Sequence, residues 1–254
     1  MAMTDLIPVP AGINAGVSSA KQATMLSLLG NPRESYDQSC REITNPRLAG
    51  LVAIRPLGPF RARGLRPALD SLAQVLADVR AAEPEIHAAL GSAGMLCARL
   101  VRGSASAISN HSWGTAIDLT LDGVLDAPGN DLVQQGLAAI APIFNRHGWF
   151  WGAGFGREDA MHFECGDALV RRWHRQGLFG PAGPPPAQVL SLGDRGPEVR
   201  RLQQALNERA GARLKVDGDF GRATQAAVMA FQAARNLETT GAAGPATLAA
   251  LGLA

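Results

Sequence analysis

The clearest pattern in the chain is a set of apolar positions that recur at helical spacing. Over residues 67–82 a leucine or valine returns every three or four positions, and Pro67 suits the first position of a helix. This segment therefore predicts an amphipathic helix with one buried face. The same spacing predicts helices over 131–147, 198–210 and 222–235, and a short helix near 20–29.

Shorter segments with a strand-like pattern lie between the first helices. They predict strands at 96–101, 115–121 and 161–165. In the second strand Ile117 and Leu119 face one way and Asp118 the other, because side chains alternate across a strand. Helices grouped around strands favour an α+β fold with a small antiparallel sheet and flanking helices.

A change in composition divides the chain. Residues 177–186 are rich in glycine and end in three consecutive prolines, which form an extended spacer and cannot continue a helix. We therefore expect a domain at 1–178, a linker at 179–188 and a small all-α domain at 189–254. Within the small domain, the segment from Gly218 repeats weakly from Gly241, which predicts two similar turn–helix units and a three-helix type of fold.

Composition excludes several classes of protein. The 254 residues carry a net charge of only +2, which argues against nucleic acid as a partner. No apolar run is long enough to insert into a membrane, and the start of the chain lacks the pattern of a secretory signal. The three cysteines are scattered without a CxxC pair, so the sequence indicates neither a disulfide framework nor a cysteine zinc site.

Five polar residues stand out as candidate chemistry. His111 and Asp118 lie seven positions apart, and Asp118 interrupts an apolar strand, where a carboxylate is costly unless it is paired or bound to metal. His162 and Glu164 share one face of the third strand, and Asp159 lies in the turn before it. Taken singly, such residues are more often hydrogen-bonded core histidines or caps. Together, two imidazoles and a carboxylate can hold zinc with a fourth position open.

The residues around His111 carry a resemblance to a known family. The segment Ser109-Asn-His-Ser-Trp-Gly-Thr-Ala-Ile-Asp118 matches Ser-x-His-x-x-Gly-x-Ala-x-Asp. This pattern resembles the zinc peptidases that include D-alanyl-D-alanine carboxypeptidases, the VanY type and L-alanyl-D-glutamate endolysins. The resemblance covers about residues 66–175 and implies one Zn²⁺ ion.

The resemblance also assigns roles. It implies His111, Asp118 and His162 as zinc ligands and Asp159, from the Asp-x-x-His pattern, as the general base. Glu164 is expected beside the ligands, with the alternative that it is the base. The family places an arginine upstream of the histidine to stabilise the oxyanion, and Arg99 and Arg102 are the candidates, with Arg99 preferred.

Two further residues near the motif are candidates for supporting roles. Ser109 is expected to hydrogen-bond a metal ligand. Trp113 lies in the motif and is expected to line the substrate cleft. For Trp149 and Trp151 the alternatives are the cleft and the core, and core packing is the more common fate of an aromatic residue.

The second domain resembles the helical peptidoglycan-binding module. The matching residues run from Leu192 through Val216-Asp-Gly-Asp-Phe-Gly-Arg-Ala-Thr to Gln232. The resemblance implies bacterial peptidoglycan as the partner. Most of these residues would build the turn and core, and we take Asp217 to Arg222 as the expected contact region.

Together these features predict a monomeric, endolysin-like peptidoglycan hydrolase that cleaves stem peptides, first as an L-alanyl-D-glutamate endopeptidase. The alternatives are a D-alanyl-D-alanine carboxypeptidase and a catalytically inactive wall-binding protein. The missing signal pattern predicts synthesis in the host cytoplasm and release to the wall through a holin-like pore or dedicated secretion.

Overall fold

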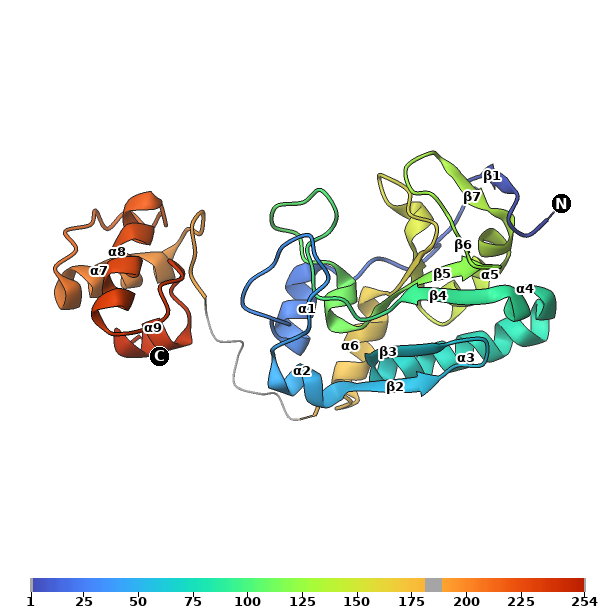
Figure 1. Ribbon diagram of the computed structural model, residues 1–254, viewed down its shortest axis with the longest axis horizontal. Helices are drawn as coiled ribbons and strands as arrows, with labels where there is room; N and C mark the ends of the chain where they lie inside the picture. The colour runs from blue at the N-terminus through green and yellow to red at the C-terminus, as the bar shows by residue number, and fades with distance from the viewer. Residues whose placement is uncertain (1, 181–188, 254) are drawn as a thin grey trace. The chain divides into compact units, whose positions relative to one another are not determined.

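The computed structural model describes residues 2–180 and 189–253 (Figure 1). The chain divides into two compact units, residues 1–183 and 184–254, and each has its own hydrophobic core. The linker expected at 179–188 lies mostly at 181–188, outside the described residues, so its extended form stays a prediction. Among the described helices, none combines the length and apolar character that a membrane span requires.

The first unit is built on an antiparallel sheet in the order β4-β5-β9-β8, with β6 paired to β5. The mixed α and β architecture expected from the sequence is thereby confirmed. Two additional two-stranded sheets pair β1 with β7 and β2 with β3. The strands of the unit are β1 (Leu6–Pro8), β2 (Val52–Pro56), β3 (Arg61–Leu65), β4 (Leu90–Gly94), β5 (Ala116–Leu121), β6 (Val124–Leu125), β7 (Leu132–Gln134), β8 (Trp149–Trp151) and β9 (His162–Cys165).

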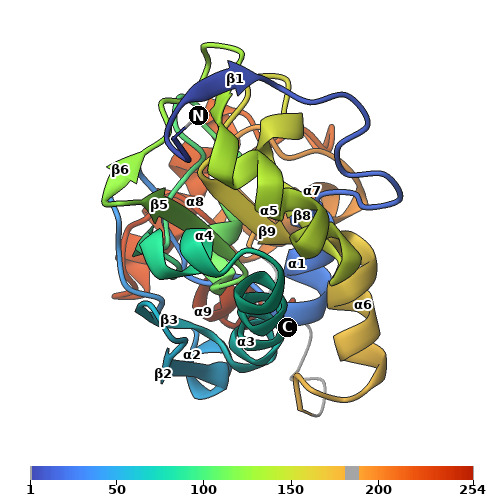
Figure 2. The same ribbon diagram turned by 90° about the vertical axis from the view of Figure 1, so that its right-hand side faces the viewer.

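Helices of the first unit cover one face of this sheet. The predicted helix over 67–82 is confirmed as α3, and its apolar stripe is fully buried. In Figure 2, α3 and α5 lie next to each other on the same side of the sheet. The helical segments are α1 (Gln22–Leu29), α2 (Pro46–Leu51), α3 (Arg66–Ala82), α4 (Pro84–Ala89), α5 (Gln135–Arg146), α6 (Asp167–Arg175) and the 3-10 turns η1 (Asn110–Trp113) and η2 (Gly152–Gly154).

Alternation along the central strands separates the core from a polar face. Ile117, Leu119 and Phe163 are fully buried, and the ring of Phe163 packs 4.2 Å from that of Phe144 in α5. The intervening residues of the same strands, Asp118 and His162, therefore face away from α5. Trp149 and Trp151 are also fully buried, so the core is the correct one of their two alternatives.

Two predictions of secondary structure were wrong, namely one strand and the start of one helix. The segment 96–101 is not a regular strand, because its residues bond singly to loops on both sides, whereas the strand paired with β5 is β4. The sequence concealed β4 because it contains Gly91 and Gly94, which carry no strand signal. A Cβ on Gly91 would collide with the Thr120 side chain, so glycine permits close packing here.

Helix α5 begins at Gln135, not at 131, because residues 132–134 pair with β1.

The expectation that no disulfide is present was also wrong. Cys40 and Cys97 form a disulfide, although 57 residues separate them in the sequence. Cysteine spacing did not show this pairing because the two residues meet only through the tertiary fold. Cys165 is a free, buried thiol in β9.

The N-terminal segment, for which the sequence showed little pattern, wraps the first unit. The Asn14 side chain accepts a hydrogen bond from the Trp151 amide at 2.8 Å. Gln22 accepts one from the Ile108 amide at 2.6 Å, and the Asn110 amide group donates to the Ala20 carbonyl. These contacts hold the loop that leads into η1, so the segment is an integral part of the first unit.

The second unit contains α7 (Pro197–Ala210), α8 (Arg222–Ala234) and α9 (Pro245–Ala250). Its two halves repeat one arrangement, as the weak sequence repeat predicted. In the first half, the buried Gln203 side chain accepts from the Gly218 amide and donates to Thr224. Gln232 does the same with Gly241 and Thr247 in the second half. Each glutamine therefore fastens a glycine turn to the start of the next helix.

Replacing Gln203 tests this arrangement. Gln203→Ala should leave buried partners without hydrogen bonds, at a cost of about 1–3 kcal/mol in the stability of the helical unit. Hydrogen exchange of the full-length protein should then increase in α7 and α8 but not in α3. Gln204→Ala, at an exposed position of the same helix, is the matched control. Equal exchange in both variants would contradict the role of Gln203.

Candidate metal centre

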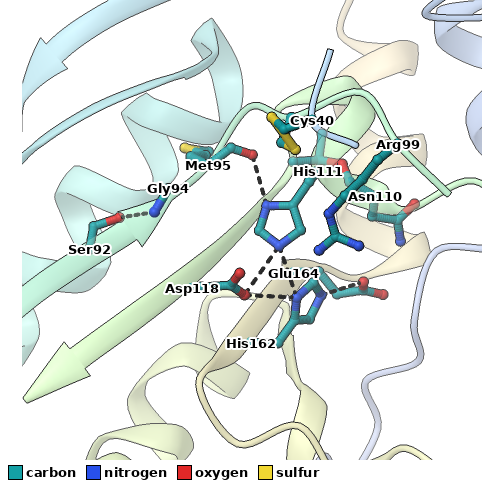
Figure 3. A network of polar contacts seen from close by, with 12 residues as sticks. Cys40, Ser92, Gly94, Met95, Arg99, Asn110, His111, Asp118, His162 and Glu164 are labelled. Atoms are coloured by element: carbon teal, nitrogen blue, oxygen red, sulfur yellow. Dashed lines mark hydrogen bonds and ion pairs between the residues drawn. A yellow bond between two sulfur atoms is a disulfide. The ribbon is translucent and has the colours of Figure 1, made fainter. Parts of the chain in front are cut away.

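Three polar side chains converge on the face of the sheet opposite α5 (Figure 3). His111 Nε2 lies 3.1 Å from Asp118 Oδ1, and His162 Nδ1 lies 3.2 Å from the same oxygen. The two ring nitrogens are 3.2 Å apart. All three ligand atoms lie within 4.8 Å of one another, and both histidines are buried. The fold thus assembles residues that are up to 51 positions apart.

Backbone geometry brings His111 to this point. Gly114 adopts a left-handed conformation, with φ 66° and ψ 33°, and ends η1 so that the chain turns directly into β5. A Cβ on Gly114 would lie only 2.7 Å from the Leu65 amide nitrogen of β3, so this close approach requires glycine. Asp118 and His162 are directly opposite partners in the β5–β9 pairing.

The outer nitrogen of each imidazole is held by a neighbouring acceptor. His111 Nδ1 donates to the Met95 carbonyl at 3.0 Å, which leaves Nε2 facing Asp118. His162 Nε2 lies 2.9 Å from Glu164 Oε2, which leaves Nδ1 facing Asp118. Such outer partners fix the tautomer and the ring orientation of metal-binding histidines. Glu164 therefore stands beside the candidate ligands, where the sequence placed it.

The electrostatics of the cluster favour a charged carboxylate. Burial favours the neutral form of Asp118, but hydrogen bonds from His111 and His162 outweigh it and hold its pKa well below the usual range. Burial lowers the pKa of His162, whereas the bonds to Asp118 and Glu164 raise it, and the net pKa lies above the ordinary histidine value. Because a bound metal would compete with protons for His162, metal binding should release protons.

The donor set fits zinc. A tetrahedral zinc ion with ligand distances of about 2.0–2.1 Å has neighbouring donors about 3.3 Å apart. The separations of 3.1–3.2 Å between the three donor atoms are close to that value. Two imidazoles and one carboxylate are also a ligand set that zinc enzymes use while leaving one position open.

Asp159 lies in the turn that precedes β9. Its backbone amide donates to the Gly152 carbonyl, and its own carbonyl accepts from His162, so the turn is fixed relative to the cluster. Burial raises the pKa of the Asp159 carboxyl above its usual range, His162 lowers it and Asp118 raises it. Within the described residues, Asp159 Oδ1 is a buried oxygen without a hydrogen-bond partner.

The two candidate arginines occupy different environments. The guanidinium of Arg99 is directed toward the histidine pair in Figure 3. Burial and Arg102 lower the pKa of Arg99, whereas the charges of Asp118 and Asp159 raise it. Arg102 is exposed in the loop that follows. Of the two arginines, Arg99 is therefore the one directed toward the candidate metal ligands.

Two predicted supporting residues have other roles. Trp113 was expected at the cleft, but it is fully buried and its ring nitrogen donates to the Gly30 carbonyl at 2.8 Å. A side chain without exposed surface cannot touch a substrate, so this expectation was wrong. Ser109 contributes backbone bonds to Arg99 and Ser112, whereas the hydroxyl that bonds the Arg99 amide belongs to Ser112.

Sequence reasoning missed several residues that support the site. Glu158 Oε2 accepts hydrogen bonds from three consecutive amides, Gly129, Asn130 and Asp131, at 2.8–2.9 Å. This buried carboxylate attaches the loop after β6 to the turn that carries Asp159. In the sequence, the signal for a supporting role of Glu158 was its position directly before Asp159. Met95 acts through its carbonyl, so no side-chain pattern could have revealed it.

In the helical unit the two candidate contact residues differ. Asp217 Oδ1 accepts from Gln203 Nε2 at 2.9 Å and from the Asp219 amide at 3.0 Å, so it stabilises the turn. Arg222 is exposed at the first position of α8. Arg222 therefore remains available for an external partner, whereas Asp217 is occupied within the fold.

The fold and this cluster thus define a candidate site for a single metal ion, formed by a His–Asp–His group. Comparison with known proteins agrees with such a site. Residues 102–165, which contain His111, Asp118, Asp159 and His162, match the family described as D-alanyl-D-alanine carboxypeptidase. Residues 195–251 match the putative peptidoglycan binding domain family. Both resemblances found in the sequence are thereby confirmed.

Two individual relatives share part of the chain. A zinc D-Ala-D-Ala carboxypeptidase of Streptomyces albus G is 52% identical over 61 residues, which are 23% of this chain and 24% of that protein. A solved structure, the Burkholderia AP3 phage endolysin, is 52% identical over 25% of this chain and 24% of its own, with a TM-score of 0.25. The chain thus spans about a quarter of the length of each of these relatives.

Loss of Glu164 should weaken metal binding. Glu164→Ala removes the acceptor that holds the His162 ring, and removing such a partner typically costs about 10–100-fold in metal affinity. The affinity for Zn²⁺ can be measured by competition with a chromophoric chelator. Glu85→Ala removes an exposed carboxylate on α4 and serves as the control. Unchanged affinity in Glu164→Ala would show that Glu164 does not orient His162.

Proposed function

We propose that this protein is a zinc peptidase that hydrolyses the stem peptides of bacterial peptidoglycan. The observation that carries the proposal is the convergence of His111, Asp118 and His162, accompanied in the turn before β9 by the buried Asp159 Oδ1, which has no hydrogen-bond partner within the described residues. These four residues lie within the segment that matches the carboxypeptidase family. A catalytically inactive wall-binding protein would have no need of a complete ligand set with an oriented base.

The ligands define what zinc would contribute. Held by His111, Asp118 and His162, a zinc ion would supply a Lewis acid that activates water and polarises a peptide carbonyl. Glu164 and Met95 keep the two rings in the orientation that presents their inner nitrogens.

The remaining polar groups divide the chemistry between them. Asp159 accepts a proton from the attacking water and passes it to the leaving amine, a role that suits a carboxylate whose pKa burial raises. Arg99 stabilises the negative charge that develops on the carbonyl oxygen. The charges of Asp118 and Asp159 raise the pKa of Arg99, which supports assigning the three groups to one site.

The helical unit would hold the enzyme at its substrate. Residues 195–251 match a peptidoglycan-binding family, so we assign this unit to wall attachment. Attachment raises the local concentration of the peptidase unit at the wall. With a net charge of +2 for the whole chain, recognition would depend on shape and hydrogen bonds, and Arg222 is the exposed candidate among the predicted contacts.

We infer an endolysin-like enzyme that acts on the wall as a monomer. The match of residues 195–251 to a peptidoglycan-binding family supports the cell wall as the setting. Synthesis in the host cytoplasm followed by release through a pore or a secretion system is part of the proposal. The Cys40–Cys97 disulfide is consistent with an oxidising compartment at the place of action.

Two variants separate catalysis from metal binding. Asp159→Asn should retain zinc and lose activity about 10²–10⁴-fold, since the amide cannot accept the proton. His111→Ala should lose both zinc and activity. Zinc is measured by elemental analysis and activity by release of free amines from purified peptidoglycan. Full activity in Asp159→Asn would remove Asp159 from the mechanism, and zinc-loaded wild-type protein without activity would support the inactive alternative.

Mass spectrometry of digested peptidoglycan decides which bond is cut. We expect cleavage between L-alanine and D-glutamate, which frees peptides that begin with D-glutamate. The second candidate, a D-alanyl-D-alanine carboxypeptidase, is favoured by the description of the matched family and by the Streptomyces relative. It would release only terminal D-alanine and leave the rest of the stem peptide intact. Exclusive release of D-alanine would overturn the endopeptidase assignment.

A further inference from the structure

The segment that carries Arg99 is held along both of its edges. On the inner edge, the Cys97 amide donates to the His111 carbonyl at 3.1 Å and the Arg99 amide donates to Ser112 Oγ at 3.1 Å. On the outer edge, Ala98 exchanges two backbone hydrogen bonds with Arg41, at 3.0 and 3.1 Å. Odd-numbered residues thus bond to the η1 side and even-numbered residues to the outer segment.

The other contacts of the outer segment, residues 37–41, lie at the surface: the Gln38 side chain donates to the Ser104 carbonyl at 2.8 Å and accepts from the Gly103 amide at 3.3 Å. The ion pair of this segment, between Asp37 and Arg41, joins two exposed side chains. Besides the Ala98 pairing, the Leu100 amide donates to the Asp37 carbonyl at 2.9 Å. The covalent attachment is the disulfide between Cys40 and Cys97, two residues before Arg99 (Figure 3).

We propose that the Cys40–Cys97 disulfide positions Arg99 over the metal site and thereby makes the activity sensitive to redox conditions. This inference rests on the proposed peptidase function. While the disulfide is closed, both edges of residues 97–100 are paired and the guanidinium points to the histidine pair. When it opens, the exposed outer segment can leave, and Arg99 is held from the inner edge alone.

The redox step involves two electrons. A dithiol, through its thiolate, attacks one sulfur and then closes its own disulfide, while Cys40 and Cys97 each leave as a thiol. Cys40 is exposed, so a reductant can reach it. In a reducing compartment the enzyme would therefore be less active than at the oxidising wall, where a disulfide persists.

The test compares oxidised and reduced forms of the same folded, zinc-loaded protein. A water-soluble phosphine is the reductant, because a dithiol would compete for zinc through its thiolates. The phosphine is oxidised to its oxide with oxygen from water. The two hydrogens of that water are taken up by the two cysteines. We expect kcat on purified peptidoglycan to fall about tenfold with little change in KM, since one oxyanion contact is loosened. Zinc content should stay constant. Cys40→Ser combined with Cys97→Ser should reproduce the reduced enzyme.

Two further measurements link the effect to Arg99. In Arg99→Ala, reduction should cause no further loss of kcat, because the residue that the disulfide positions is already absent. Hydrogen exchange should increase at 37–41 and 95–100 on reduction but not in β5. An equal tenfold loss in Arg99→Ala, unchanged kcat, or loss of zinc on reduction would overturn the inference. If the oxidised enzyme is inactive, the proposed function fails, and the exchange experiment alone decides whether the disulfide holds the Arg99 segment.

Discussion

The structure of the first unit depends on placing the carboxylate of Asp118 between two buried imidazoles. A charge inside an apolar strand is costly, and it is tolerated only when partners surround it. Here both histidines approach one oxygen at 3.1–3.2 Å. Since each ring is in turn bonded to Met95 or Glu164, the charge is enclosed by an ordered network. The sheet register, η1 and the loop at Met95 must all be correct for this network to exist.

This requirement explains why distant segments close around the site. Glu164 is itself buried, and burial raises its pKa, whereas His162 and hydrogen bonds from Ser19 and Asn110 lower it. The N-terminal segment therefore helps to keep Glu164 charged behind His162. The same segment holds Asn110 through the Ala20 carbonyl, at the start of the turn that presents His111. Residues 19 and 20 thus support the candidate metal centre as well as the packing of the unit.

Periodicity was sufficient to predict the parts of the fold whose signal is local. The leucine stripe of α3, the alternation of Asp118 between Ile117 and Leu119, and the shared face of His162 and Glu164 all follow from residue spacing. The missed features arise from contacts between distant residues. Strand β4 is specified by close packing at Gly91, and the disulfide joins cysteines 57 positions apart. Trp113 shows the same limit, since only the tertiary fold places its ring nitrogen against Gly30.

The distribution of hydrogen bonds around the turn before β9 clarifies how a base can be both fixed and available. Glu158 receives three backbone amides and thereby attaches its turn to the neighbouring loop. Asp159, the next residue, is positioned through its backbone amide and carbonyl. In the part of the chain that the structure describes, its buried Oδ1 is left without a partner, which is unusual for a carboxylate. The turn is thus held through Glu158 and the backbone, whereas the carboxylate of Asp159, the base of the proposed mechanism, keeps its Oδ1 without a partner within the described residues.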